Sequence, residues 1–255
     1  MNLESKKIVI TGASSGIGKE ILSLLLSEGA LVVVGDLNPE IIPDHPNLRK
    51  FKIDVSKTAD MDKLLEESIE ILDKIDVFIA NAGFAYYEKI QKEDWSRIKN
   101  IFSVNVFSPI YTIQKLIHLQ PKGVHIFITA SGMALLPLPG YALYSATKSA
   151  VHSFAEAFRY EMNKNFKLTV VYPIATKTKF FEQAGGSVPV PWPAQEPSLV
   201  AKKIVKAILR PRKSVHPSFR FKTLLVLNRF FPFLFPIYRL WQNILFQKWQ
   251  KRKES

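Results

Sequence analysis

Apolar residues recur along most of the chain in two alternating patterns. Short continuous apolar runs predict buried strands, and apolar residues three or four positions apart predict helices that cover those strands. The predicted strands are residues 7–11, 31–34, 51–55, 77–80, 124–129 and 168–172, and the predicted helices are residues 16–28, 57–73, 95–118 (as one helix or two), 144–163 and 199–210. Continuous apolar strands joined by helices are typical of a parallel sheet buried on both faces. The pattern therefore predicts an α/β fold: a Rossmann-like doubly wound parallel sheet flanked by helices, in a single domain.

The regular alternation stops after residue 173. Residues 182–198 hold two glycines and four prolines, and loops this long inside a compact domain are usually functional. We predict a lid-like loop over about residues 179–198, in which Phe180, Phe181 and Trp192 cover a substrate entrance. The predicted domain spans residues 1–210, and residues 211–255 form a C-terminal extension.

A glycine-rich turn stands where the first predicted strand meets the first predicted helix. It reads Thr11-Gly12-Ala13-Ser14-Ser15-Gly16-Ile17-Gly18. Gly12 permits a tight turn, Gly16 lets a diphosphate approach the backbone, and Gly18 lets the helix pack on the strand. The N–H groups at the helix start and the helix dipole both favour a diphosphate there. An ordinary strand-to-helix loop is the alternative interpretation.

Asp36 ends the second predicted strand. A carboxylate at this position can accept hydrogen bonds from both hydroxyls of an adenosine ribose, and it would repel a 2′-phosphate. Asp36 therefore favours NAD over NADP, while Ser14, Ser15 and Lys19 leave NADP as the second choice. The alternative is a turn aspartate before an Asn-Pro pair.

Tyr144 and Lys148 lie four residues apart at the start of a predicted helix, which places both side chains on one helical face. An ammonium beside a phenol stabilises the phenolate, so Tyr144 can exchange a proton with a substrate oxygen near neutral pH. Ser131 follows the fifth predicted strand and is placed to hydrogen-bond the same oxygen. A tyrosine and a lysine at this spacing are common on helix surfaces, and it is the nucleotide-binding turn upstream that favours the catalytic interpretation.

About residues 5–210 resemble the classical short-chain dehydrogenase/reductase family. The resemblance rests on the glycine-rich turn, on Asn81-Ala82-Gly83 after the fourth predicted strand, and on Tyr144-x-x-x-Lys148 thirteen residues after Ser131. Asn105, Asp54-Val55 and Thr178 also stand at positions of the family pattern. Three positions depart from it, namely Ala80, Ser108 and Pro173-Ile174. None of these is a catalytic position, although the last can reshape the pocket of the nicotinamide.

The resemblance implies four catalytic residues. Tyr144 is the acid and base, Lys148 lowers its pKa and binds the nicotinamide ribose, and Ser131 orients the reacting oxygen. Asn105 holds a water that links Lys148 to solvent. The implied cofactor-binding residues, with Asp54 and Val55 at the adenine and Thr178 at the nicotinamide carboxamide, are Gly12, Ser14, Ser15, Gly16, Ile17, Gly18, Asp36, Asp54, Val55, Asn81, Ala82, Gly83, Tyr144, Lys148 and Thr178. Family analogy also implies a homo-dimer or homo-tetramer.

The positive charge of the chain is concentrated at its C-terminal end. Of the formal net charge of +13, residues 211–255 contribute +9, with ten Lys or Arg and one acid, Glu254. Because the charge is confined to an aromatic extension, nucleic acid is not a predicted partner. The longest stretch without Lys or Arg between Arg229 and Arg239 has nine residues and two prolines, which is too short to span a bilayer. We expect peripheral contact of residues 218–253 with an anionic membrane. Packing of the extension on the domain or on a dimer partner is the alternative.

Several classes of site are excluded by composition. The chain has no cysteine, which rules out a disulfide framework and a thiolate nucleophile, and its five histidines are scattered, so no metal site is predicted. The polar N-terminus predicts no signal peptide. We expect a cytoplasmic protein, peripheral on the inner face of a membrane.

Together these features predict an oxidoreductase. It transfers a hydride between a nicotinamide cofactor and a secondary alcohol or ketone, with an apolar or lipid-like substrate at a membrane surface. Residues 1–210 would then bind the dinucleotide and carry the catalytic residues. A non-catalytic nucleotide-binding regulator or scaffold is the alternative, and the intact catalytic set argues against it.

Overall fold

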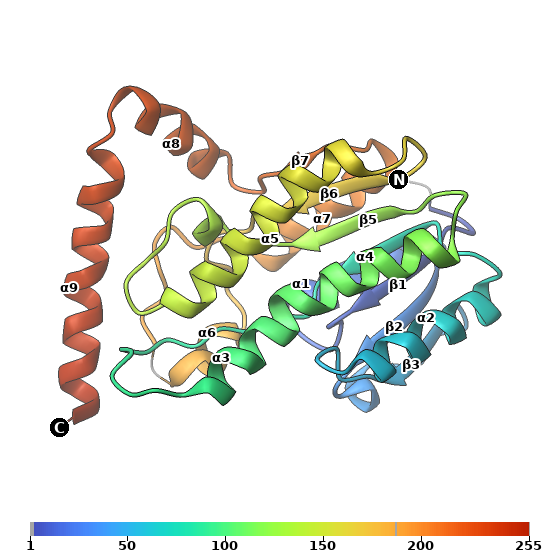
Figure 1. Ribbon diagram of the computed structural model, residues 1–255, viewed down its shortest axis with the longest axis horizontal. Helices are drawn as coiled ribbons and strands as arrows, with labels where there is room; N and C mark the ends of the chain where they lie inside the picture. The colour runs from blue at the N-terminus through green and yellow to red at the C-terminus, as the bar shows by residue number, and fades with distance from the viewer. Residues whose placement is uncertain (1–2, 187, 255) are drawn as a thin grey trace.

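Seven strands form one parallel sheet at the centre of the protein (Figure 1). The computed structural model describes residues 3–186 and 188–254. Residues 1, 2, 187 and 255, which fall in the predicted domain, lid-like loop and extension, lie outside the described residues. The strands are β1 Lys7–Thr11, β2 Leu31–Asp36, β3 Leu48–Lys52, β4 Val77–Ala80, β5 His125–Thr129, β6 Lys167–Val171 and β7 Ser214–Val215.

The strand order is β3-β2-β1-β4-β5-β6-β7, which confirms the predicted doubly wound sheet. Strand β1 pairs in parallel with β2 on one side and with β4 on the other, where Ile8 lies opposite Val32 and Val77. The strand order reverses between β1 and β4, and in such sheets ligands bind in the crevice at the carboxyl ends of these strands.

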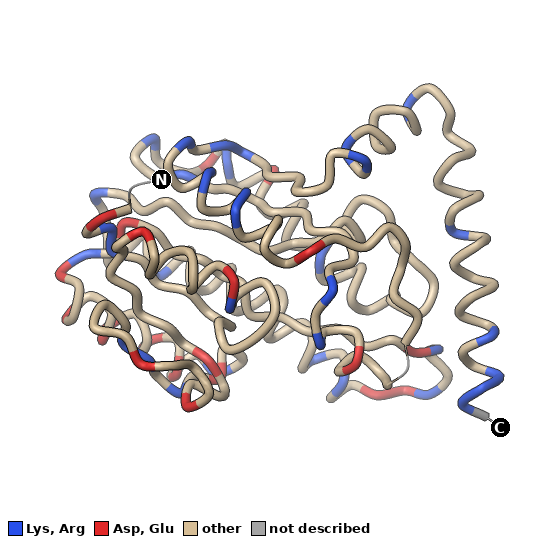
Figure 2. The backbone as a smooth tube through the Cα atoms, turned by 180° about the vertical axis from the view of Figure 1, so that it is seen from behind, with Lys and Arg blue, Asp and Glu red and all other residues tan. Residues whose placement is uncertain are grey.

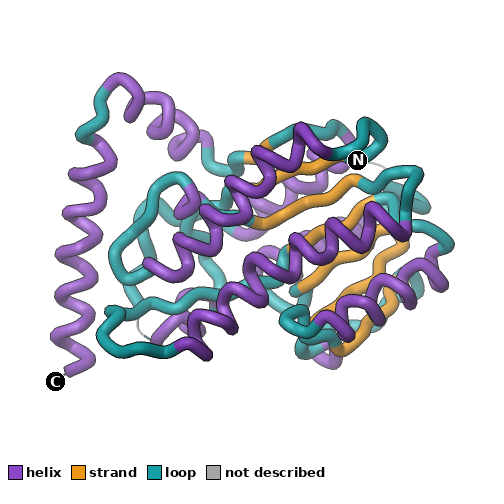
Figure 3. Tube along the Cα trace, in the orientation of Figure 1, coloured by secondary structure: helices purple, strands orange, loops and turns teal. Residues whose placement is uncertain are grey.

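Helices cover both faces of the sheet (Figure 3). Side chains alternate across a strand, so Ile8 and Ile10 enter one core layer and Val9 enters the other. The first layer is covered by α1 Gly16–Ser27 and α7 Pro197–Leu209, and the second by α2 Thr58–Leu72, α4 Ser108–Leu119 and α5 Ala142–Glu161. The remaining elements of this part are α3 Trp95–Phe102, α6 Phe180–Gly185, a π-helical turn at Ser103–Phe107, and 3-10 turns at Pro39–Ile41 and Gly132–Ala134.

Two strands differ from the sequence prediction, and one open alternative is decided. The third strand spans Leu48–Lys52 instead of residues 51–55. It lies at the edge of the sheet, where Arg49 and Lys52 are exposed, so its sequence lacks the continuous apolar pattern of a central strand. Residues 95–118, predicted as one helix or two, form the two helices α3 and α4 on either side of the π-helical turn, and Pro109 stands in the first turn of α4. Strand β7 lies beyond residue 210, where the domain was predicted to end.

The last two helices, α8 Phe219–Phe230 and α9 Leu234–Glu254, form what we call the arm. The arm stands on the side of the molecule that the carboxyl ends of the strands face (Figure 1). Phe221, Phe246 and Trp249 are buried in a third apolar cluster that also contains Tyr141 and Tyr144. Part of the extension therefore packs on its own domain, as the alternative interpretation expects. Within the part of the chain that the structure describes, no helix is both long and apolar enough to cross a membrane.

Candidate active site

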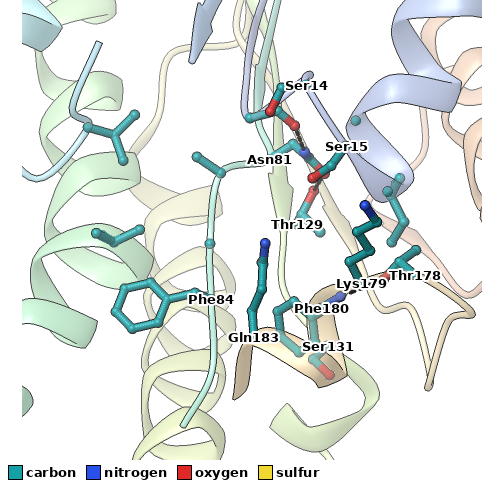
Figure 4. A pocket seen from close by; sticks show the side chains of 18 of the residues that line it. Ser14, Ser15, Asn81, Phe84, Thr129, Ser131, Thr178, Lys179, Phe180 and Gln183 are labelled. Atoms are coloured by element: carbon teal, nitrogen blue, oxygen red, sulfur yellow. Dashed lines mark hydrogen bonds between the residues drawn. The ribbon is translucent and has the colours of Figure 1, made fainter. Parts of the chain in front are cut away.

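A cavity of about 490 Å³ lies at the carboxyl ends of the central strands. Figure 4 shows Ser14 and Ser15 toward one end of it and Phe84, Gln183 and Ser131 toward the other. Every residue that the sequence assigns to cofactor binding lines this cavity, as do three of the four catalytic residues: Gly12, Ser14, Ser15, Gly16, Ile17, Gly18, Asp36, Asp54, Val55, Asn81, Ala82, Gly83, Thr178, Ser131, Tyr144 and Lys148. Residues as far apart in the sequence as Gly12 and Thr178 thus line the same cavity.

The glycine-rich turn is packed so tightly that side chains are excluded. Gly12 has a φ of +69°, and a Cβ there would lie 2.7 Å from the Cα of Ala82. A Cβ on Gly18 would lie 1.9 Å from the carbonyl oxygen of Gly12. The turn therefore presents bare backbone and the start of α1 to the cavity, which is the environment that a diphosphate requires. The residues present fit a dinucleotide.

Asn81 ties the glycine-rich turn to the end of β4. Its side-chain amide donates to the carbonyl oxygen of Gly12 at 2.7 Å. The hydroxyl oxygen of Thr11 accepts from the backbone N–H groups of Asn81 and Ala82, each at 3.2 Å. The Asn81 side chain thus binds the protein's own backbone. Asn81 also lines the cavity, so its predicted contact with the cofactor stays a prediction.

Asp36 is buried at the end of β2 and is held by backbone groups. One carboxylate oxygen accepts from the N–H of Ser14 at 2.8 Å, and the other accepts from the N–H of Asn38 at 3.0 Å. Each oxygen of a carboxylate has a further lone pair, so both can still accept from a ribose hydroxyl. The cations that line the cavity within the described residues are Lys148 and Lys179, whereas Lys19 is not on its wall.

Asp54 and Thr178 also take fixed positions on the wall. Burial opposes ionisation of Asp54, but hydrogen bonds from the N–H and hydroxyl of Ser56, at 3.0 and 2.7 Å, together with the nearby charge of Lys57 hold the pKa of Asp54 below its usual value. The side chain of Thr178 lies 3.3 Å from the place where a Cβ on Gly16 would stand. Thr178, which follows β6, is therefore brought against the glycine-rich turn.

Ser131, Tyr144 and Lys148 meet at the end of β5. The hydroxyl of Ser131 accepts from the N–H of Met133 at 3.1 Å, which fixes its position, and it hydrogen-bonds to Tyr144. Lys148 donates to the carbonyl oxygen of Thr129 at 2.8 Å, and its ammonium lies 5.6 Å from the centre of the Tyr144 ring. The three side chains are thus held by β5 and by the first turns of α5.

The pKa values of this group are governed by burial. Burial raises the pKa of Tyr144 to about 12, although the hydrogen bond with Ser131 acts in the opposite direction. Burial lowers the pKa of Lys148 to about 8. The family resemblance implies that Lys148 lowers the pKa of Tyr144. In this structure the pKa of Tyr144 is raised instead, because desolvation of the phenolate dominates. At neutral pH Tyr144 is a protonated donor beside a charged lysine.

Asn105 lies behind the cavity wall and not on it. It sits in the π-helical turn, a feature that often occurs at functional sites. Its amide donates to the carbonyl oxygen of Phe84 at 2.9 Å and to the hydroxyl of Thr147 at 3.1 Å, and its carbonyl oxygen accepts from the N–H of Phe84 at 3.1 Å. Both amide hydrogens are thus used to join the segment after β4 to α5. The role that the resemblance implies for Asn105, to hold a water that links Lys148 to solvent, stays a prediction.

Several wall residues were not among the catalytic or cofactor-binding residues predicted from the sequence, although Phe180 was predicted to cover a substrate entrance. Phe84 follows Asn81-Ala82-Gly83 directly, and Lys179 and Phe180 follow Thr178, so adjacency to a motif was the available signal. Gln183 reaches the cavity only because α6 forms inside the predicted lid-like loop. Figure 4 shows these four side chains among the residues that line the cavity.

The pKa of Lys148 predicts a pH profile for carbonyl reduction. Below about pH 8 the ammonium is charged and stabilises the phenolate that forms when Tyr144 gives up its proton. We expect kcat/KM to fall as the pH rises through this region, because Lys148 loses its charge. Lys148→Arg, whose pKa lies above about 12, should be slower overall but lack this fall. A wild-type profile that stays level to pH 10 would contradict the assignment.

The family model described as short chain dehydrogenase matches residues 6–187. The chain therefore belongs to the short-chain dehydrogenase family, as the sequence motifs predicted. It is an NAD(P)-dependent oxidoreductase of this family.

Relatives and solved structures agree with this assignment. The chain is 32% identical over 190 residues to an uncharacterised oxidoreductase of Staphylococcus saprophyticus, a match that covers 70% of this chain and 77% of that protein. It is 28% identical over 241 residues to 11-beta-hydroxysteroid dehydrogenase 1A of Arabidopsis thaliana, covering 84% of this chain and 68% of that protein. Two short-chain dehydrogenase structures, from Burkholderia phymatum with NAD and Burkholderia cenocepacia with NADP, share its fold with TM-scores of 0.78, identities of 20% and 22%, and coverage of 90% of this chain and 94% of theirs.

Proposed function

We propose that this chain interconverts an apolar secondary alcohol and its ketone with NAD, at the surface of an anionic membrane. The observation that carries the proposal is the single cavity in which Ser131, Tyr144 and Lys148 share a wall with Asp36 and the glycine-rich turn. A dinucleotide held along this wall brings its reactive ring and the proton donor to one substrate oxygen.

The residues of the chain handle the proton and the geometry. The bound nicotinamide cofactor supplies or accepts the hydride. Ser131 donates a hydrogen bond to the carbonyl oxygen, and Tyr144 transfers its proton to that oxygen as negative charge develops there. The charge of Lys148 then stabilises the phenolate. In alcohol oxidation the same residues act in reverse, with Tyr144 taking the hydroxyl proton.

NAD is the proposed cofactor because Asp36 stands where the adenosine ribose would lie. Its carboxylate is buried and oriented by two backbone N–H groups. A 2′-phosphate placed there would meet this negative charge, and this favours NAD over NADP.

An apolar substrate is supported by the side chains near Ser131. Phe84, Met133 and Phe180 line the cavity there, and the ring of Phe180 lies edge-on to Tyr144 at 5.6 Å between ring centres. The relative from Arabidopsis thaliana is a hydroxysteroid dehydrogenase by name, and steroids are apolar secondary alcohols or ketones. Both points favour a hydrophobic molecule over a small polar one.

The membrane part of the proposal rests on the outer face of the arm. Apolar side chains that are exposed on it include Phe219, Phe230, Ile237 and Leu240, with exposed fractions between 59% and 79%. Figure 2 shows Lys and Arg along both helices of the arm. Exposed apolar residues interleaved with cations are typical of segments that lie in the interface of an anionic membrane.

Turnover assays test the proposed reaction directly. Purified full-length protein is mixed with NADH or NADPH and a series of long-chain ketones, hydroxysteroid-type ketones and small polar ketones, and cofactor oxidation is followed by absorbance. We expect activity with NADH on the apolar ketones. Tight cofactor binding without turnover of any ketone or alcohol would instead support the regulator interpretation.

Vesicle co-sedimentation tests the membrane surface. We expect the protein to sediment with vesicles that contain phosphatidylglycerol, and less so in high salt or with phosphatidylcholine alone. The double variant Phe230→Ser/Leu240→Ser should weaken binding by about tenfold or more, because two apolar side chains no longer enter the lipid. The control Ile41→Ser/Ile90→Ser removes two exposed apolar residues outside the arm, 62% and 60% exposed, and should bind like the wild type. Equal sedimentation of both variants would contradict the role of the arm.

A further inference from the structure

Lys179 brings a positive charge to the wall of the large cavity, although it was not predicted as a site residue. It follows Thr178 directly, and the side chain of Thr178 lies 3.3 Å from the place where a Cβ on Gly16 would stand. The chain therefore passes close to the glycine-rich turn just before Lys179. Figure 4 shows Lys179 beside Thr178, with its side chain pointing toward Ser15. The ammonium is thus placed near the turn that faces a diphosphate.

The charge of Lys179 is open to a ligand. Among the described residues, no hydrogen bond or ion pair engages its side chain. The other lysine on the wall, Lys148, donates to the carbonyl oxygen of Thr129 at 2.8 Å. Lys177, two positions before Lys179, pairs with Glu196 at 2.6 Å. Lys148 and Lys177 are therefore held by the protein itself, whereas Lys179 is not.

A cation beside the glycine-rich turn offsets a negative charge that the turn already holds. One carboxylate oxygen of Asp36 accepts from the backbone N–H of Ser14 at 2.8 Å. This N–H is therefore occupied, and a carboxylate is fixed next to the turn. Each phosphate of a diphosphate is negative and is repelled by that carboxylate, while the start of a helix supplies only about half an elementary charge. A neighbouring ammonium that hydrogen-bonds to a phosphate oxygen adds a full positive charge.

We infer that Lys179 binds the diphosphate of the nicotinamide cofactor, an inference that rests on the dinucleotide site of the proposed function. The contact serves NAD and NADP alike, because both contain the diphosphate. Lys179 is followed directly by Phe180, whose ring lies edge-on to Tyr144 at 5.6 Å between ring centres. Holding Lys179 at the diphosphate therefore also holds Phe180 beside the proton donor.

Lys179→Met tests this role, because it removes the charge and keeps a long, flexible side chain at an exposed position. Dissociation constants of the full-length protein are measured by fluorescence titration with NADH and NADPH, and by calorimetry with ADP and adenosine. We expect the variant to bind NADH, NADPH and ADP about tenfold more weakly, since it loses one hydrogen bond to a charged group. Adenosine has no phosphate and should bind with wild-type affinity. Lys179→Arg keeps the charge and should bind NADH within about threefold of the wild type.

Salt gives a readout that a purely structural effect would not change. The difference in NADH affinity between wild type and Lys179→Met should be largest in about 0.05 M salt and should shrink in about 0.5 M salt, because dissolved ions screen exposed charges. The matched control is Lys177→Met, which removes an exposed lysine of the same segment that does not line the cavity. It should bind all four ligands as the wild type does.

Four outcomes would overturn the role of Lys179. Equal affinity of wild type and Lys179→Met for NADH and ADP would do so and leave the dinucleotide site intact. A loss confined to NADPH would place the ammonium at the 2′-phosphate instead. An equal loss with adenosine would show that the substitution disturbs the site as a whole. Wild-type protein that binds neither NADH nor NADPH would overturn the proposed function itself, together with this contact.

Discussion

Replacing Tyr144 by phenylalanine should lower kcat by about 10²–10⁴-fold, the range that general acid and base catalysis contributes. The variant lacks the proton that the substrate oxygen must receive, and among the described residues that line the cavity Tyr144 is the only phenol. The ring remains, so the packing against Phe180 and the shape of the cavity are kept. Cofactor affinity, measured by fluorescence titration with NADH, should therefore change little.

Tyr160→Phe provides the control for this experiment. Tyr160 lies on the same helix, α5, and is 92% exposed. Its loss of a hydroxyl should leave both turnover and cofactor affinity at wild-type values. Near-normal activity of Tyr144→Phe on a genuine substrate would show that the proton comes from another group.

Asp36→Ala should weaken binding of NADH by about 10- to 100-fold, because hydrogen bonds to a charged group contribute about 1.5–3 kcal/mol. Binding of NADPH should strengthen relative to NADH, since the charge that repels a 2′-phosphate is gone. Titration of wild type and variant with both reduced cofactors measures the change in preference.

Asp36 also accepts hydrogen bonds from the backbone N–H groups of Ser14 and Asn38. Asp36→Ala could therefore weaken cofactor binding by disturbing this backbone, and a second variant is needed to separate that effect from the loss of charge. Asp36→Asn removes the charge and keeps one acceptor oxygen in the same place. If repulsion is the cause, this variant should also lose discrimination against NADPH. Wild-type protein that binds NADPH more tightly than NADH would refute the inference from Asp36.

The sheet and the nucleotide-binding turn were predictable from the sequence because each depends on local patterns. Central strands such as β1 and β4 are buried on both faces and read as continuous apolar runs. The edge strand β3 has exposed polar residues and was placed three residues too late. Strand β7 has only two residues, too few for any pattern, and it is defined by pairing with β6.

The surroundings of the site residues were less predictable, because they depend on packing between distant segments. Spacing alone placed Tyr144 and Lys148 on one face of a helix, but burial, which sets their pKa values, follows from the cluster around them. The contacts of Asn105 with Phe84 likewise join segments that the motif pattern treats separately. The family motifs identified the candidate site residues, whereas their burial, their hydrogen-bond partners and their pKa values depend on the folded structure.

The burial of Phe246 and Trp249 against Tyr87 and Tyr141 has a consequence for how the protein is made. A ribosome releases the chain from its N-terminus, and the sheet can fold while the last helix is still being synthesised. The aromatic cluster that contains Tyr144 is completed only when α9 has emerged. A chain that loses its last helix through interrupted synthesis or proteolysis would therefore keep its nucleotide-binding sheet but expose the apolar surface that Phe246 and Trp249 otherwise cover.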